Sequence, residues 1–239
     1  MKARSLVEVC TGSLSDSVRA FEAGSNRIEL NSSLELGGLS ASPGTLIAVI
    51  ESIEIPVIAM VRPRSGSFVY SYSEKKAMLL DTEFYLSNGA AGIAVGAFAP
   101  EGGIDTDFVT ELRKLAGKND LVFHRAFDLL PDQFQSLAIL AELGVDRILT
   151  SGGCRTAWEG RNTIRELINR YGEHIEIMPG SGINSANADA VVKHTGCSQL
   201  HGSFSKKKEF HQSVAKVLTS YGIETSYSEI KRTISNLSN

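Results

Sequence analysis

The chain has 239 residues, of which 42% are hydrophobic and 21% charged, and its formal net charge is −3. This composition is typical of a globular protein, and the chain is long enough to build a hydrophobic core without disulfide or metal crosslinks. The small negative charge gives no support to a nucleic-acid-binding protein, and we interpret the short lysine run at 206–208 as a solvated loop.

Short apolar runs alternate with amphipathic stretches along the chain. We expect eight strands, at 6–10, 27–30, 56–61, 92–95, 121–124, 147–150, 175–178 and 199–201. Helices are expected between them and in the tail, at 14–23, 43–52, 73–87, 105–116, 132–143, 156–171, 185–194 and 228–237. This order predicts a parallel sheet closed into a single (β/α)₈ TIM barrel. An open doubly wound sheet is the alternative, but the turn at 10–13 lacks its glycine pattern.

The length of the chain predicts its number of domains, and its cysteines predict its cellular compartment. One domain accounts for residues 1–239, with a partly helical tail from about 203 to 239. The three cysteines, Cys10, Cys154 and Cys197, are odd in number and far apart, which favours a reducing compartment. The N-terminus leads into a strand without the apolar region of a signal peptide, and no apolar run reaches transmembrane length. We therefore expect a cytoplasmic protein without membrane or nucleic-acid partners.

Charged side chains lie near the ends of several predicted strands, at the face where barrels place their chemistry. Because a buried charge must pair or contact a ligand, we expect Glu8, Glu29, Arg62 and His124 to form one network at the barrel mouth. One interpretation is an enzyme for a small anionic or phosphorylated substrate, with Glu8 or Glu29 as general base and His124 as general acid. The alternative is a structural ion-pair network that closes the barrel.

Two glycine-rich turns follow the sixth and seventh predicted strands, at 151–153 and 179–184. Such turns before a helix offer backbone N–H groups to an anion, and late loops of barrels commonly do so. The expected anion-binding residues are Arg62, Arg64, Ser151, Gly152, Gly180 and Gly182. The alternative is that the glycines serve tight turns with positive φ.

The spacing of potential metal ligands matches none of the common motifs, because the sequence has no H-x-H, H-E-x-x-H or C-x-x-C. Soft Cu(I) prefers sulfur ligands, and Cys10 lies at the end of the first strand with Met178 at the end of the seventh. His201, with Glu8 or Glu29, is a candidate for a harder metal. The alternative for each cysteine is a small buried apolar residue.

Seven stretches of the sequence together resemble one known family, the CutC family of copper homeostasis proteins. The resemblance runs from residue 6 to about 205, and its stretches are 8–10, 26–30, 37–42, 60–70, 123–128, 148–152 and 177–183. The sequences Arg62-Pro63-Arg64 and F-H-R-A-F-D at 123–128 are specific to it. The resemblance implies a TIM-type barrel, a cytosolic homo-oligomer such as a dimer or tetramer, and a role in copper tolerance or Cu(I) binding. It makes a metal or a small molecule the expected ligand.

One position departs from the family pattern. The family often reads R-I-E-L-C in the second strand, and that cysteine has been proposed to form a Cu(I) pair with the cysteine of the first strand. Here the position is Asn31, and a neutral amide is a poor ligand for Cu(I). Two hypotheses remain: a copper homeostasis protein that binds Cu(I) weakly through Cys10 or acts indirectly, and the acid–base enzyme described above.

Overall fold

The computed structural model describes residues 5–209 and 221–238. Eight strands form the central sheet: β1 Leu6–Thr11, β2 Arg27–Leu30, β3 Val57–Met60, β4 Gly92–Val95, β5 Asp120–Phe123, β6 Arg147–Thr150, β7 Glu176–Pro179 and β8 Gln199–Gly202. The helices are α1 Leu14–Glu22, α2 Pro43–Ser52, α3 Tyr72–Ser87, α4 Thr106–Ala116, α5 Gln133–Glu142, α6 Arg161–Tyr171, α7 Ala188–Thr195 and α9 Tyr227–Asn236. Short 3₁₀ turns, η1 Leu34–Leu36 and η2 Arg125–Leu129, follow β2 and β5.

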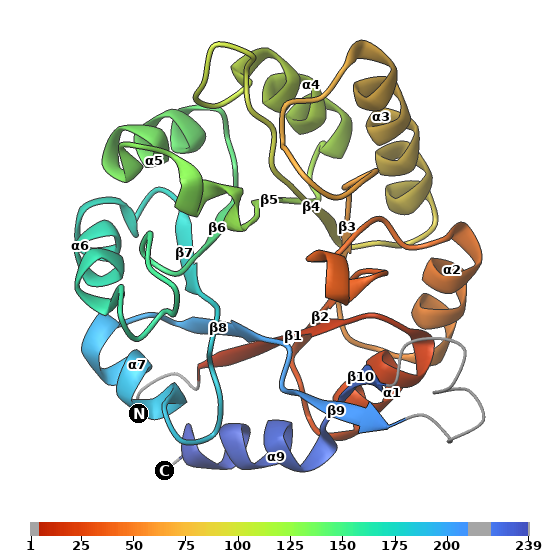
Figure 1. The fold of residues 1–239 in the computed structure, drawn as a ribbon, viewed down its shortest axis with the longest axis vertical. Coiled ribbons are helices and arrows are strands. Elements are labelled where there is room, and N and C mark those ends of the chain that lie inside the picture. Colours follow the sequence, from red (N-terminus) through yellow and green to blue (C-terminus); the bar gives the residue numbers. More distant parts are fainter. Residues whose placement is uncertain (1–4, 210–220, 239) are drawn as a thin grey trace.

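The sheet is a parallel barrel surrounded by helices, as the sequence predicts (Figure 1). Its hydrogen-bonded order is β7-β6-β5-β4-β3-β2-β1-β8, and β7 and β8 lie next to each other at the two ends of this order. The register aligns Glu8 of β1 with Arg27 of β2 and with His201 of β8. Three charged or titratable side chains therefore lie at one level of the barrel.

The barrel interior has two chemically different sides. On the side of β3, β4 and β5, a small apolar cluster fills the interior, formed by Ile58, Met60, Ala94 and Val122. On the side of β8, β1 and β2, the interior side chains are charged or polar. The larger hydrophobic core lies between the strands and the helices, because alternate residues of each strand point outwards.

The helix starts follow their capping residues. Asp105 and Asp132, expected as first helical residues, are N-caps whose carboxylates accept backbone N–H groups of the first turn. The helix expected to begin at 156 begins at Arg161, because Gly160 packs so closely on the backbone of Ser151 that a Cβ there would overlap its carbonyl oxygen. The helix expected at 185–194 begins at Ala188, after a turn closed by asparagine side chains.

The tail returns to the barrel. Residues Ser205–Glu209 form β9, which pairs antiparallel with β10, Tyr221–Thr225. The interpretation of the lysine run as a loop is therefore wrong: it is a strand without apolar residues, so no hydrophobic alternation marks it. The amide of Thr225 donates to Asp16 at 2.8 Å, and α9 buries Ile230 and Ile234 beside α1 and α7.

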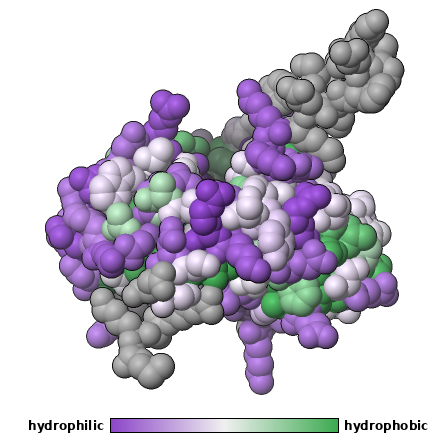
Figure 2. Space-filling view, turned by 90° about the horizontal axis from the view of Figure 1, so that it is seen from below, coloured by the Kyte–Doolittle hydropathy of each residue, from purple (hydrophilic) through white to green (hydrophobic). Residues whose placement is uncertain are grey.

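Figure 2 shows the face that carries α9, where hydrophilic residues dominate and the strongest hydrophobic patch lies towards the right edge. None of the helices within the described residues combines the length and apolarity needed to cross a membrane.

Candidate functional site

The innermost charged group of the barrel is Glu8, which is 2% exposed. One carboxylate oxygen accepts from Nδ1 of His201 at 2.7 Å, and the other accepts from Nε of Arg27. Arg27 also donates to Gln199 at 2.6 Å. Burial raises the pKa of Glu8, but the hydrogen bond from His201 and the charges of Arg27, His201 and Arg147 outweigh it and lower that pKa to about 2. Glu8 is therefore an ionised, fully partnered group, an arrangement that does not support the expected role of general base.

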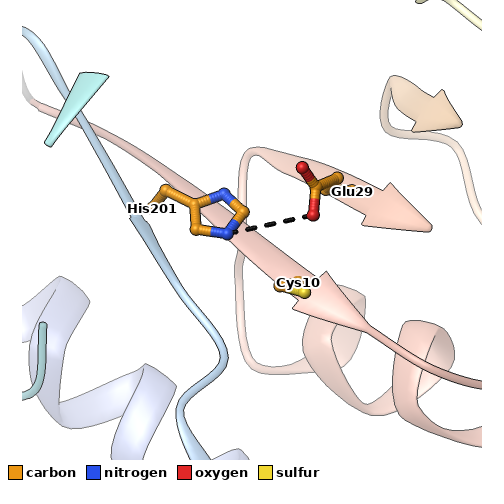
Figure 3. A group of neighbouring side chains, drawn as sticks. All are labelled: Cys10, Glu29 and His201. Carbon is orange, nitrogen blue, oxygen red and sulfur yellow. Dashed lines mark ion pairs between the residues drawn. The ribbon is translucent and has the colours of Figure 1, made fainter. Parts of the chain in front are cut away.

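One level nearer the mouth, three potential metal ligands converge (Figure 3). Sγ of Cys10, a carboxylate oxygen of Glu29 and a ring nitrogen of His201 all lie within 4.8 Å of one another. Nε2 of His201 is 3.9 Å from Oε2 of Glu29. The three residues come from the neighbouring strands β1, β2 and β8, so the barrel closure brings them together.

Asn31 closes this cluster on one side. Its amide donates to Oε2 of Glu29 at 2.9 Å and to Sγ of Cys10 at 3.3 Å. Burial, the charge of Glu29 and its hydrogen bond raise the pKa of the Cys10 thiol well above its usual range. Without a bound cation, Cys10 is a neutral thiol at physiological pH.

The imidazole of His201 is held in a defined orientation. Burial alone would lower its pKa, but the charge of Glu29 and the hydrogen bond to Glu8 raise it. With Nδ1 hydrogen-bonded to Glu8, Nε2 faces Glu29 and Cys10. A carboxylate behind a metal-binding histidine is the usual way to fix its tautomer and direct its other nitrogen at the ion.

The single network expected from the sequence is divided in two. Glu8 and Glu29 belong with His201, whereas Arg62 and His124 lie together elsewhere in the mouth. The guanidinium of Arg62 donates to the carbonyl oxygens of Leu36, Gly37, Gly38 and Gly66 at 3.1–3.3 Å. Arg27, the second partner of Glu8, was not among the expected site residues, and its place opposite Glu8 follows from the strand register.

His124 is a neutral imidazole. Its Nδ1 accepts from the amide of Ala126 at 3.1 Å, and its ring lies against Phe68 with centroids 5.0 Å apart. Burial and the nearby charge of Arg62 lower its pKa to about 3. An imidazolium is therefore not present at neutral pH, which argues against the expected role of general acid.

The glycine-rich loop after β6 already holds an anion, and it is the carboxylate of Asp128. That carboxylate accepts from the amides of Ser151 and Gly153 and from the hydroxyls of Thr150 and Ser151. The amide of Gly152 donates to Thr150. These groups do not form the expected free anion site, and the sequence analysis missed the role of Asp128.

The remaining expected anion ligands are dispersed. The amide of Gly180 is bonded to the carbonyl of Thr150 in the sheet ladder. Arg64 forms an ion pair with Glu74 at the base of α3, and it lines neither cavity described below. Gly182 alone of the four loop residues lines a cavity at the mouth.

Two cavities open at the mouth and share Cys10, Arg125 and His201. The first has a volume of about 550 Å³, lies towards β7, β8 and the tail, and has a wall in which polar and apolar surface are about equal. The second has a volume of about 400 Å³ and extends from Glu29 past Met60 and Arg62 to His124. The cluster of Cys10, Glu29 and His201 thus lies where the two cavities meet.

The fold and this cluster define a (β/α)₈ barrel with a thiol, an imidazole and a carboxylate gathered at its mouth. The chain belongs to the CutC family, whose family model matches residues 5–206. A family protein CutC of Treponema denticola is 44% identical over 216 residues, covering 90% of this chain and 88% of the relative. The copper homeostasis protein cutC homolog of Mus musculus is 36% identical and covers 94% of this chain and 82% of its own.

Solved structures agree with this assignment. The crystal structure of the putative copper homeostasis protein CutC from Streptococcus agalactiae superposes with a TM-score of 0.79 at 32% identity, covering 83% of this chain and 98% of that one. N-(5′-phosphoribosyl)anthranilate isomerase from Pyrococcus furiosus has a TM-score of 0.59 at 14% identity and covers 98% of this chain and 99% of its own, a likeness that concerns the fold alone.

Proposed function

We propose that this protein takes part in copper homeostasis by binding Cu(I) at the barrel mouth, through Sγ of Cys10 and Nε2 of His201. The observation that carries the proposal is the convergence of Cys10, His201 and Glu29 within 4.8 Å. Thiolate and imidazole donors suit Cu(I), which is stable with few ligands. Relatives named for copper homeostasis support the same role.

The surrounding residues would tune the site. Glu8 directs the lone pair of His201 Nε2 towards the ion, and Glu29 offers a negative charge beside it. Asn31 donates a hydrogen bond to the sulfur of Cys10 and would stabilise its thiolate form. Binding of Cu(I) would release the thiol proton.

An anaerobic titration of the reduced protein with Cu(I), in competition with a chromophoric chelator, tests the proposal. We expect one tight equivalent in the wild type, lost in Cys10→Ser and weakened in His201→Gln. Cys154→Ser is the matched control, because Cys154 is an exposed thiol in another loop. Tight binding that survives Cys10→Ser would contradict the proposal, and so would tighter binding of Zn(II) than of Cu(I).

The compartment and the assembly are proposals of the same kind. Three free cysteines, one of them exposed, support work in the reducing cytoplasm. We also propose a homo-oligomer, on the basis of the family resemblance. Sedimentation velocity on the reduced protein tests the assembly, and a monomer at micromolar concentration would contradict it.

A further inference from the structure

The second cavity contains two buried hydrogen-bond donors that nothing in the described chain satisfies. Nε2 of His124 and Nε of Arg62 are both buried without a partner among the described residues. Both side chains line the cavity of about 400 Å³. A buried polar atom without a partner costs free energy, so such atoms beside a cavity indicate a ligand that completes them.

Both of these atoms are donors, whereas the third buried atom in this wall that has no partner within the described ranges, Oδ1 of Asn31, is an acceptor. Nδ1 of His124 accepts from the amide of Ala126, so the ring proton of the neutral imidazole resides on Nε2. The low pKa of His124 keeps the ring in this neutral form. Nε of Arg62 carries a proton at any physiological pH. The complementary ligand group therefore accepts hydrogen bonds, as an oxygen atom does.

The charges around the cavity favour an anion. Arg125 pairs with Asp128 at 2.9 Å, and Glu29 faces His201 across 3.9 Å. Arg62, in contrast, donates to carbonyl oxygens and lies beside the phenol of Tyr70, and no carboxylate pairs with it in the residues that the structure describes. One buried positive charge in the wall is thus left without a counter-ion, a costly arrangement unless a ligand supplies one.

The rest of the wall is largely apolar. Met60, Phe68 and Leu149 line the cavity beside the two donors, and Phe68 also lies under the guanidinium of Arg62 at 4.9 Å. An apolar wall with a few convergent polar groups, in this size range, is typical of a site for a small organic molecule. An inorganic anion would leave the apolar wall uncovered.

We propose that this cavity binds a small organic carboxylate, whose oxygens accept from Nε2 of His124 and Nε of Arg62 and whose apolar body lies against Met60, Phe68 and Leu149. The site adjoins the proposed Cu(I) ligands Cys10 and His201 but uses different donors, so it does not depend on copper binding.

The test uses the full-length, metal-free protein and benzoate as the probe, with benzyl alcohol as its uncharged counterpart and acetate as its counterpart without the ring. Long-range ¹H–¹⁵N NMR of the histidine rings reads the His124 Nε2 resonance directly, and calorimetry gives the affinities. We expect benzoate to shift that resonance and to bind more tightly than both counterparts. No shift with benzoate, or equal binding of benzyl alcohol, would overturn the proposal.

Two variants distinguish loss of the hydrogen-bond donor of His124 from loss of the fold. His124→Asn keeps an oxygen near the position of Nδ1 for the amide of Ala126 but removes the donor that faces the cavity, whereas His124→Gln can restore a donor near the position of Nε2. We expect His124→Asn to weaken benzoate binding about tenfold and His124→Gln to stay close to the wild type. The exposed His174, changed to Asn, is the matched control. Unchanged affinity in His124→Asn would contradict the assignment, and if that variant does not fold, the wild-type resonance still decides.

Discussion

The two sides of the barrel mouth differ in how their buried charged and polar groups are paired. Beside β8, β1 and β2, the charged groups Glu8, Arg27 and His201 are joined by hydrogen bonds. Beside β3 and β5, Arg62 and His124 lie over an apolar interior and keep donors without partners. The first side is internally complete and presents a sulfur and a nitrogen to an ion. The second is complete only with a ligand, which is the physical difference between a metal-type site and an organic-ligand site.

The largest effect that sharpens this comparison comes from Arg27. Changing Arg27 to Met leaves the buried Glu8 with His201 alone, and removing one partner of a buried ion pair costs about 3–5 kcal/mol of unfolding free energy. Chemical denaturation measures this loss. The control is Arg170→Met, which removes an exposed pair with Glu166 and should cost less than about 1 kcal/mol. An equally small loss for Arg27→Met would mean that this side is not held by its charges.

In the part of the tail that the structure describes, α9 packs on α1 and α7 behind β1 and β8, and so supports the side of the mouth that carries Cys10. Ile230 is fully buried there, so we expect Ile230→Ala to cost about 2–5 kcal/mol. We propose that barrel and tail form one domain, and denaturation of this variant should then remain a single transition. Hydrogen exchange that rises near β3 and β4 rather than near β1 and β8 would contradict the one-sided support.

The two histidines predict opposite responses of stability to pH. The folded pKa of His124, about 3, lies below its ordinary 6.5, so its contribution is present above pH 6.5 and is lost as the pH falls. The slope approaches about 1.4 kcal/mol per pH unit between pH 6.5 and 4.5. The contribution of Glu8 is lost below this range, as the pH falls from its ordinary pKa of 4.5 towards its folded pKa of about 2. His201 has a raised pKa, so its contribution is present below pH 6.5 and is lost as the pH rises through that folded pKa.

Unfolding free energies measured from pH 4.5 to 8 separate these contributions. His124→Gln should flatten the loss on the acid side, and His201→Gln should flatten the loss on the alkaline side. His174→Gln, at an exposed position, serves as the control and should leave the profile unchanged. If both site variants flatten the same side, the distinction between the two imidazoles is wrong.

The affinities for Cu(I) and for benzoate should also differ in their pH dependence. Because the pKa values of the Cys10 thiol and of His201 are both raised, Cu(I) must displace the thiol proton and, below the folded pKa of His201, an imidazolium proton as well. Its affinity should therefore rise by about tenfold per pH unit or more between pH 6 and 8. Benzoate, which binds a neutral imidazole and a guanidinium, should bind with nearly constant affinity over the same range. Competition titrations and calorimetry at matched ionic strength measure the two slopes, and parallel slopes would argue against two separate sites.

The sequence predicted the barrel well because its strands are short apolar runs separated by clear helix caps. Strands β2, β4 and β6 begin and end where expected. The strand β9 could not be found, because pairing with β10 rather than burial of alternate residues makes it a strand. Local patterns report burial and capping, and they do not report pairing between polar segments.

The candidate site was predictable to the level of strand ends and no further. Alternation along β1 and β2 placed Glu8, Cys10 and Glu29 inside the barrel, and closure brought His201 beside them. Which arginine meets Glu8 depends on register, and this favoured Arg27 over Arg62. The donors of the loop after β6 are occupied because the side chain of Asp128 points towards them. Residue type and spacing in the sequence do not determine that direction.

The carboxylate of Asp128 occupies the amide and hydroxyl donors of the loop after β6. It is a tethered acceptor, present beside those donors at an effective concentration that a free anion could not match. These loop donors are therefore already satisfied within the chain, and a free anion could reach them only by displacing Asp128.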